Sequence, residues 1–223
     1  MTDGTRSKLM AGALTTLVEH GIAGASARTI AAAAGVNQAL VFYHFGTVDE
    51  LLVAACRHGA EQRVAAHRER LDEVRSIREL LDLSRELRAG ERAGGHVAAL
   101  AQLLAGAQTH QRLATATAAG LALWTDEIEE VLLRVLGETP LAGLVDIAGL
   151  AKAVSAAFVG LQLYEGVDVA GADAAFGALE QLVGLVAAFD ELGPVTARTI
   201  RSRLRRTAAP APSTDRSDRP AGP

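Results

Sequence analysis

Apolar side chains recur at intervals of three and four residues through most of the chain, and this spacing predicts a protein built from helices. The first such segment covers residues 5–20, and Gly21 ends it because glycine readily adopts the left-handed conformation found after helix C-termini. Its apolar face is formed by Leu9, Met10, Ala13, Leu14 and Leu17. Further helices are predicted over residues 48–71, 76–90, 97–104, 112–136, 144–166, 173–189 and 195–206.

Residues 26–45 contain two shorter predicted helices separated by a tight turn. Ser26 is a favourable N-cap for the first, and Gly35 permits the chain to turn after Ala34. Asn37 can cap the second, which extends to His44. Two short helices around a glycine turn form a helix-turn-helix, and the second helix of this motif enters the DNA major groove.

The second of these helices has an inward and an outward face. Val41 and Phe45 are four residues apart, so both point toward the first helix of the chain and toward Ile30. The exposed leading end then carries Gln38, Ala39 and Leu40, and the flank carries Phe42, Tyr43 and His44.

The order and spacing of the flanking residues extend this pattern. The residues are Leu9-Met10, Ala13-Leu14, Leu17, Gly21, Ser26, Ile30-Ala31, Ala34-Gly35-Val36, His44-Phe45, Thr47 and Asp49-Glu50-Leu51-Leu52. Residues 5–55 resemble the N-terminal DNA-binding domain of the tetracycline-repressor (TetR) family of bacterial regulators. The resemblance implies an all-α chain, with a three-helix DNA-binding domain at residues 1–47. A helical effector-binding and dimerisation domain at residues 48–206 and a disordered tail at 207–223 complete the predicted organisation.

Chemistry and the resemblance together assign the DNA-contacting residues. The Gln38 amide matches the edge of adenine, whereas Ala39 and Leu40 offer apolar contact to a thymine methyl group. Tyr43 and His44 can donate to phosphate oxygens, which positions the protein without reading sequence. The expected DNA-binding set is Arg28, Thr29, Asn37, Gln38, Ala39, Leu40, Phe42, Tyr43 and His44.

Charge and two departures from the family pattern favour a second interpretation. The chain has a net charge of −4, and its first 50 residues hold three basic groups against four acidic ones. Many relatives have a tyrosine where this chain has Phe42 and a lysine where it has Val48, so two common phosphate contacts are missing. The alternative to a DNA-binding regulator is therefore a helical ligand-binding or scaffolding protein that has lost operator binding. The salt dependence of duplex binding separates the two.

Helices 144–166 and 173–189 are apolar on nearly every side, which predicts that both are buried. Either the core of one chain or a homodimer interface would bury them, and the resemblance favours the interface. The expected interface residues are Leu150, Val154, Leu161, Leu179, Val183 and Val186. A dimer of this kind would bind a pseudo-palindromic double-stranded DNA operator.

The resemblance also implies a small-molecule effector that releases the protein from DNA, most commonly as a repressor. Pockets of this kind are mostly apolar with a few polar groups. The candidates are Gln102, Gln108, His110, Trp124, Phe158, Gln162 and Tyr164, and ordinary packing is an equal alternative for each. Charged residues are rare in the apolar helices, so we expect a largely apolar or uncharged ligand.

Composition limits the other possibilities. The single cysteine, Cys56, fits a reducing cytoplasm and a packing role, and neither a signal peptide nor an apolar run of membrane-spanning length is evident. The sequence has no phosphate-binding loop, no catalytic serine motif and no metal-ligand spacing among its six histidines, so we expect neither an enzyme nor a cofactor. The arginines in the helix at 195–206 fit a solvated terminal helix or an auxiliary basic patch for DNA.

Overall fold

The computed structural model describes residues 2–94, 96–137, 139 and 145–190. Within these ranges the chain forms nine α-helices, one 3-10 helix and no strand, which confirms the all-α prediction. The elements are α1 (Thr2–His20), η1 (Ile22–Gly24), α2 (Ala27–Ala33), α3 (Ala39–Phe45), α4 (Val48–Glu73), α5 (Ile77–Gly94), α6 (His96–Ala107), α7 (Gln111–Leu136), α8 (Ile147–Glu165) and α9 (Val169–Asp190). The helix predicted at 195–206 and the tail at 207–223 lie outside the described residues.

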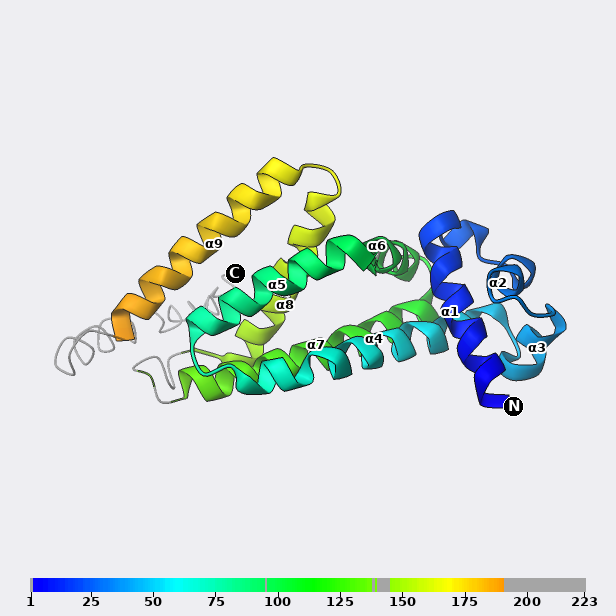
Figure 1. Cartoon of the computed structure of the whole chain (residues 1–223), viewed down its shortest axis with the longest axis horizontal. Coiled ribbons are helices and arrows are strands. Elements are labelled where there is room, and N and C mark those ends of the chain that lie inside the picture. The colour runs from blue at the N-terminus through cyan, green and yellow to red at the C-terminus, as the bar shows by residue number, and fades with distance from the viewer. Residues whose placement is uncertain (1, 95, 138, 140–144, 191–223) are drawn as a thin grey trace, which may run out of the picture.

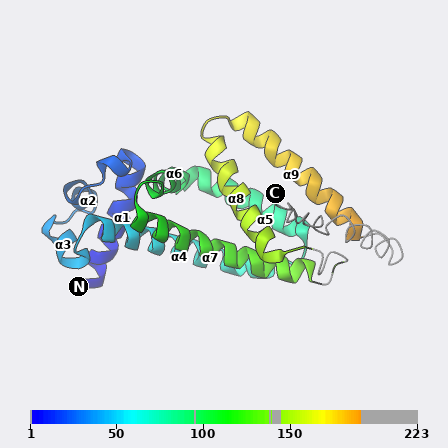
Figure 2. The ribbon, with the colours of Figure 1, turned by 180° about the vertical axis from the view of Figure 1, so that it is seen from behind.

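The helices are arranged along one long axis (Figure 1). The three N-terminal helices form one end, and α4 and α7 run side by side away from them, as the view from behind also shows (Figure 2). α6 lies against α1, while α8 and α9 pack together at the other end of the molecule. Because α4 starts beside the three N-terminal helices and continues along α7, it connects the two parts of the molecule directly.

Local hydrogen bonds explain where the N-terminal helices begin and end. Ser26 Oγ accepts from the Thr29 N–H at 3.2 Å, and Thr29 Oγ1 accepts from the Ser26 N–H at 2.9 Å, which forms a reciprocal cap at the start of α2. Gly35 then turns the chain with a φ of 64°, where a side chain would be strained. Thr47 Oγ1 accepts from the Glu50 N–H at 3.1 Å and so caps α4, as its position predicts.

The largest differences from the predicted helix boundaries lie at the end of α5 and at the start of α9. The helix predicted to end at residue 90 continues through Gly90 to Gly94, so that predicted end is wrong. One glycine destabilises a helix by only about 1 kcal/mol, so Gly90 alone does not end α5. α9 begins at Val169 rather than after Asp173, because the Asp168 carboxylate accepts from the Gly171 N–H at 2.9 Å and supplies the cap instead.

The largest hydrophobic core crosses the boundary predicted at residue 47. It contains α1 and α2 residues such as Leu9, Leu17 and Ile30, and it also contains Leu103 from α6 and Leu113 from α7. Two smaller clusters join α4, α5, α7 and α8. The DNA-binding helices therefore share their core with the helices that follow.

α1 and α2 cross closely at Gly12. A Cβ atom there would lie 2.8 Å from the Ala34 backbone nitrogen and 2.9 Å from the Ile30 carbonyl oxygen. Since these are backbone atoms, the two helices would have to separate. We predict that Gly12→Ala lowers the free energy of unfolding by about 1–3 kcal/mol, as overpacking does.

Gly4 provides the matched control, because it lies in the same helix and no other atom lies within 4 Å of the point that its Cβ would occupy. Gly4→Ala should leave stability unchanged or raise it by about 0.5–1 kcal/mol, since alanine is the better helix former. Chemical denaturation of both variants measures the difference. Equal stability of the two would contradict the close crossing.

Candidate nucleic-acid interface

α3 has an inward and an outward face, but Leu40, expected at the exposed leading end, is half-buried and packs against the main core. Val41 and Phe45 are buried in the main core, and they fix the helix to the rest of the domain. On the other side Gln38, Ala39 and Phe42 are exposed, and Tyr43 is 75% exposed. The exposed residues therefore form a continuous surface at the end of the molecule.

The polar residues around this surface differ in how much hydrogen-bonding capacity they retain. The Asn37 side-chain carbonyl oxygen accepts from the Ala39 N–H at 2.8 Å, so it caps α3. The Thr29 hydroxyl accepts from the Ser26 N–H and donates to the Gly24 carbonyl oxygen at 2.8 Å, so it holds the start of α2. By contrast, the Gln38 side chain makes no cap hydrogen bond, and Arg28 is exposed. Gln38 and Arg28 are thus the groups best able to meet a partner.

Arg6 has a role that sequence spacing does not reveal. Its guanidinium donates to the carbonyl oxygen of His44 at 3.2 Å and lies 4.5 Å from the centre of the Phe45 ring. Arg6 therefore attaches the C-terminal end of α3 to α1, using both a hydrogen bond and a cation–π contact. Arg6 and His44 are 38 positions apart in the chain, so no local pattern connects them.

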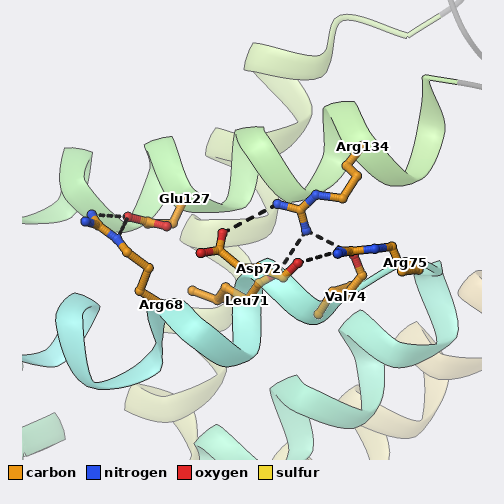
Figure 3. A network of polar contacts seen from close by, with 7 residues as sticks. All are labelled: Arg68, Leu71, Asp72, Val74, Arg75, Glu127 and Arg134. Carbon is orange, nitrogen blue, oxygen red and sulfur yellow. Dashed lines mark hydrogen bonds and ion pairs between the residues drawn. The ribbon is translucent and has the colours of Figure 1, made fainter.

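A polar network fixes the far end of α4 to α7 (Figure 3). Arg68 Nε donates to the buried carboxylate of Glu127 at 2.9 Å, and this hydrogen bond raises the pKa of Arg68. Arg134 donates to the carbonyl oxygens of Leu71 and Val74 at 2.9 and 3.0 Å, which satisfies groups left open at the C-terminus of α4. α4 is therefore attached to its neighbours at both ends.

The residues predicted to form an effector pocket lie in separate places. Gln102 faces η1, Gln108 and His110 are exposed near the α6–α7 turn, and Trp124 packs near His67 with ring centres 5.9 Å apart. The remaining three lie on α8, where Gln162 is buried, Phe158 is half-buried and Tyr164 is exposed. The structure thus divides the predicted set among four regions.

A cavity of about 270 Å³ lies between α5 and α9. Its lining includes Arg85, Arg88, Asp173, Phe176 and Glu180, and none of the predicted pocket residues contributes to it. Arg88 donates to Glu165 at 2.9 Å and to Asp173 at 2.7 Å, while the Arg85 hydrogen bond lowers the pKa of Glu180. These charged groups are already paired with each other.

Neither the cysteine nor a metal-ligand cluster provides a reactive site in the described part of the chain. Cys56 is buried, and this burial raises the pKa of its thiol, which disfavours the nucleophilic thiolate. In the described part of the chain, no cluster of three histidine, cysteine, aspartate or glutamate side chains could hold a metal ion.

The residues predicted for a dimer interface lie on α8 and α9. Leu150, Val154, Leu161 and Val183 are half-buried and Leu179 is exposed, whereas the side chain of Val186 lies outside the described set. α8 is long and apolar enough to cross a membrane by length and composition alone, and in this fold it packs against α7 and α9. The other described residues of the chain leave much of its apolar surface uncovered.

Residues 9–55, which span the helix-turn-helix and the start of α4, match the family described as bacterial regulatory proteins, tetR family. These residues form a DNA-binding domain of the TetR type. This result confirms the resemblance found in the sequence and supports a DNA-binding transcriptional regulator, with α3 as the second helix of the helix-turn-helix.

Solved structures of TetR-family and other regulators share the whole fold. A transcriptional regulator from Rhodococcus sp. Rha1 is 25% identical with a TM-score of 0.65, and the match covers 85% of this chain and 99% of that one. A TetR transcription regulator from Haloarcula marismortui is 19% identical with a TM-score of 0.68, covering 83% and 98%. The fatty acid degradation regulator FadR from Bacillus halodurans is 16% identical with a TM-score of 0.64, covering 80% and 94%. No curated protein matches the chain.

Comparing Arg6 with Lys8 separates the effect of holding α3 in place from the effect of positive charge. Both are exposed cations on α1, and of the two Arg6 contacts α3. We predict that Arg6→Gln weakens binding to the preferred duplex by about 1 kcal/mol more than Lys8→Gln does, the net contribution of one hydrogen bond. Fluorescence anisotropy with a labelled duplex measures both. Equal losses from the two variants would show that Arg6 acts through its charge alone.

Proposed function

We propose that the chain is a cytoplasmic repressor that binds a pseudo-palindromic operator as a homodimer and leaves it when a small, largely apolar ligand binds. The observation that carries this proposal is the exposed face of α3, where Gln38 retains its full hydrogen-bonding capacity beside the apolar Ala39 and Phe42. An amide can make paired hydrogen bonds to an adenine edge, and apolar neighbours suit a thymine methyl group. The DNA-binding domain of the TetR type supports the same role.

Dimerisation through α8 and α9 is supported by the apolar surface that one chain leaves uncovered. Leu179, Leu182 and Leu185 follow each other at three-residue intervals on α9, and all three are exposed. In the most apolar stretch of α8, only 11% of the residues are buried. Large exposed apolar surfaces mark protein interfaces in water-soluble proteins, and a second copy of the same helices would cover these.

For the effector, the strongest support comes from Gln162 on α8. This residue is 6% exposed, and its amide nitrogen has no hydrogen-bond partner among the described residues. Phe158 lies one turn earlier on the same face of the helix. A ligand with an apolar body and one hydrogen-bond acceptor would satisfy that nitrogen, because a buried donor without a partner is costly.

A second function, a helical ligand-binding or scaffolding protein without operator binding, is favoured by two observations. The exposed Phe42 has no hydroxyl to donate to phosphate, and the first 50 residues carry more acidic than basic groups. Selection of bound duplexes from a random pool, followed by a salt titration, distinguishes the two functions. The proposed regulator enriches a palindromic sequence and binds it less tightly as salt rises, whereas the alternative enriches no sequence.

Base reading by Gln38 has its own test. We predict that Gln38→Ala weakens binding to the selected operator by about 1–3 kcal/mol and changes binding to random duplex little, because a bidentate base contact is lost. Tyr43→Phe is the control on the same helix, since a phosphate contact is lost equally on every sequence. If Gln38→Ala weakens binding to the operator and to random duplex by the same amount, Gln38 does not read a base.

The dimer is tested by placing a charge in the exposed leucine stripe. Leu182→Glu should dissociate the dimer at micromolar concentration, because the carboxylate would be buried against the partner's apolar surface. Leu133→Glu is the matched control, since Leu133 on α7 is similarly exposed but lies away from the stripe. Sedimentation velocity measures the assembly of both. A monomeric wild-type chain would contradict the proposal.

A further inference from the structure

Ile22, the first residue of η1, is held by α6 through both its backbone and its side chain. Its N–H donates to the Gln102 side-chain carbonyl oxygen at 3.3 Å. Its side chain fills the space beside Gly106, where a Cβ atom would lie 2.4 Å from Ile22 Cδ1 and 2.7 Å from Leu113 Cδ2. Gln102 and Gly106 are four residues apart, so both lie on one face of α6. We call Gln102, Gly106 and Leu113 the Ile22 socket.

The N–H of Ile22, at the start of η1, needs a hydrogen-bond acceptor from another part of the chain. The first N–H groups of any helix have no partner within it, and a side chain before the helix usually supplies one. Gly21 precedes η1 with a φ of 64° and has no side chain to do so. Gln102 meets this need from α6, and a Cβ at Gly21 would approach its oxygen to 3.0 Å. The absence of a side chain at Gly21 therefore leaves room for the Gln102 amide that accepts from the Ile22 N–H.

The socket gives the DNA-binding end a second attachment. α4 is the covalent connection, and a single connection of this kind would let α1–α3 rotate about its start at Val48. Contact between Ile22 and α6 lies away from that point and, together with the packing of α1 against α6, removes this freedom. The orientation of α3 therefore follows the position of α6 as well as that of α4.

We infer that Gln102 is a positioning residue that fixes α1–α3 against α6 and so sets the separation of the two recognition helices. The inference rests on the proposed function, because the separation matters only in an operator-bound dimer. Two recognition helices must match successive major grooves about 34 Å apart, so a small rotation of each DNA-binding end changes which half-site spacing fits. Binding to one half-site needs no such match.

The test compares Gln102→Met with Gln108→Met in the full-length protein. Both replace a glutamine by a side chain of similar size, but Gln108, just after α6, is exposed and only contacts the Leu104 carbonyl oxygen one turn earlier. Gln102→Glu retains an acceptor oxygen and serves as the conservative variant. Two measurements follow: amide hydrogen exchange at Ile22 without DNA, and binding to duplexes that carry one half-site or two half-sites at varied spacing.

We expect Gln102→Met to raise Ile22 exchange by roughly 3- to 10-fold, the factor that one net hydrogen bond provides. The same variant should bind the best-spaced operator several-fold less tightly, discriminate less between spacings, and bind a single half-site like the wild type. Gln108→Met should match the wild type throughout, and Gln102→Glu should restore at least part of the Ile22 protection.

Unchanged Ile22 exchange in Gln102→Met would overturn the inference, and so would equal losses on single and paired half-sites. Failure of the proposed function has a different signature, because the wild-type chain would then bind no duplex at all. The exchange measurement needs no DNA, so it tests the socket in either case.

Discussion

Leu103 and Leu113 pack into the same core as the helix-turn-helix, and the rest of the structure depends on this contact. The three N-terminal helices are short, and α2 and α3 have only seven residues each. Helices of that length are unstable alone in water, so their stability comes from packing against longer neighbours. α4, α6 and α7 supply those neighbours and thereby join the N-terminal helices to the rest of the helical bundle.

The contacts that hold α3 serve recognition directly. Val41 and Phe45 anchor one face in the core, Asn37 caps the start and Arg6 holds the end. The opposite face is therefore presented on a rigid element, as sequence reading requires. A change that loosens any of these attachments would alter DNA binding without touching a base-contacting residue.

Features set by local pattern could be predicted from the sequence. The caps at Ser26 and Thr47, the turn at Gly35 and the inward pair Val41 and Phe45 all depend on residues close together in the chain. The boundary errors also have a local origin. Gly90 resembles a helix stop, but one glycine costs a helix only about 1 kcal/mol and α5 continues to Gly94.

Long-range contacts could not be predicted in this way. Gln102 has the polar character expected of a pocket residue, but its partner Ile22 is 80 positions away. Arg6 likewise resembles a phosphate-binding cation until its contact with the His44 carbonyl is known. The position of a polar side chain in a helical bundle depends on how helices cross, and the spacing of residues within one helix does not determine that crossing.

The shared core makes the DNA-binding end and the effector helices one cooperative unit, and native-state hydrogen exchange over a denaturant series measures this most directly. A shared core predicts that amides of α1, such as Leu17, open with the same free energy and denaturant dependence as those of α7, such as Leu113 and Ala116. If the amides of α1 opened at clearly lower free energy while those of α6 and α7 stayed protected, the two parts would be independent domains and the shared core would not couple them.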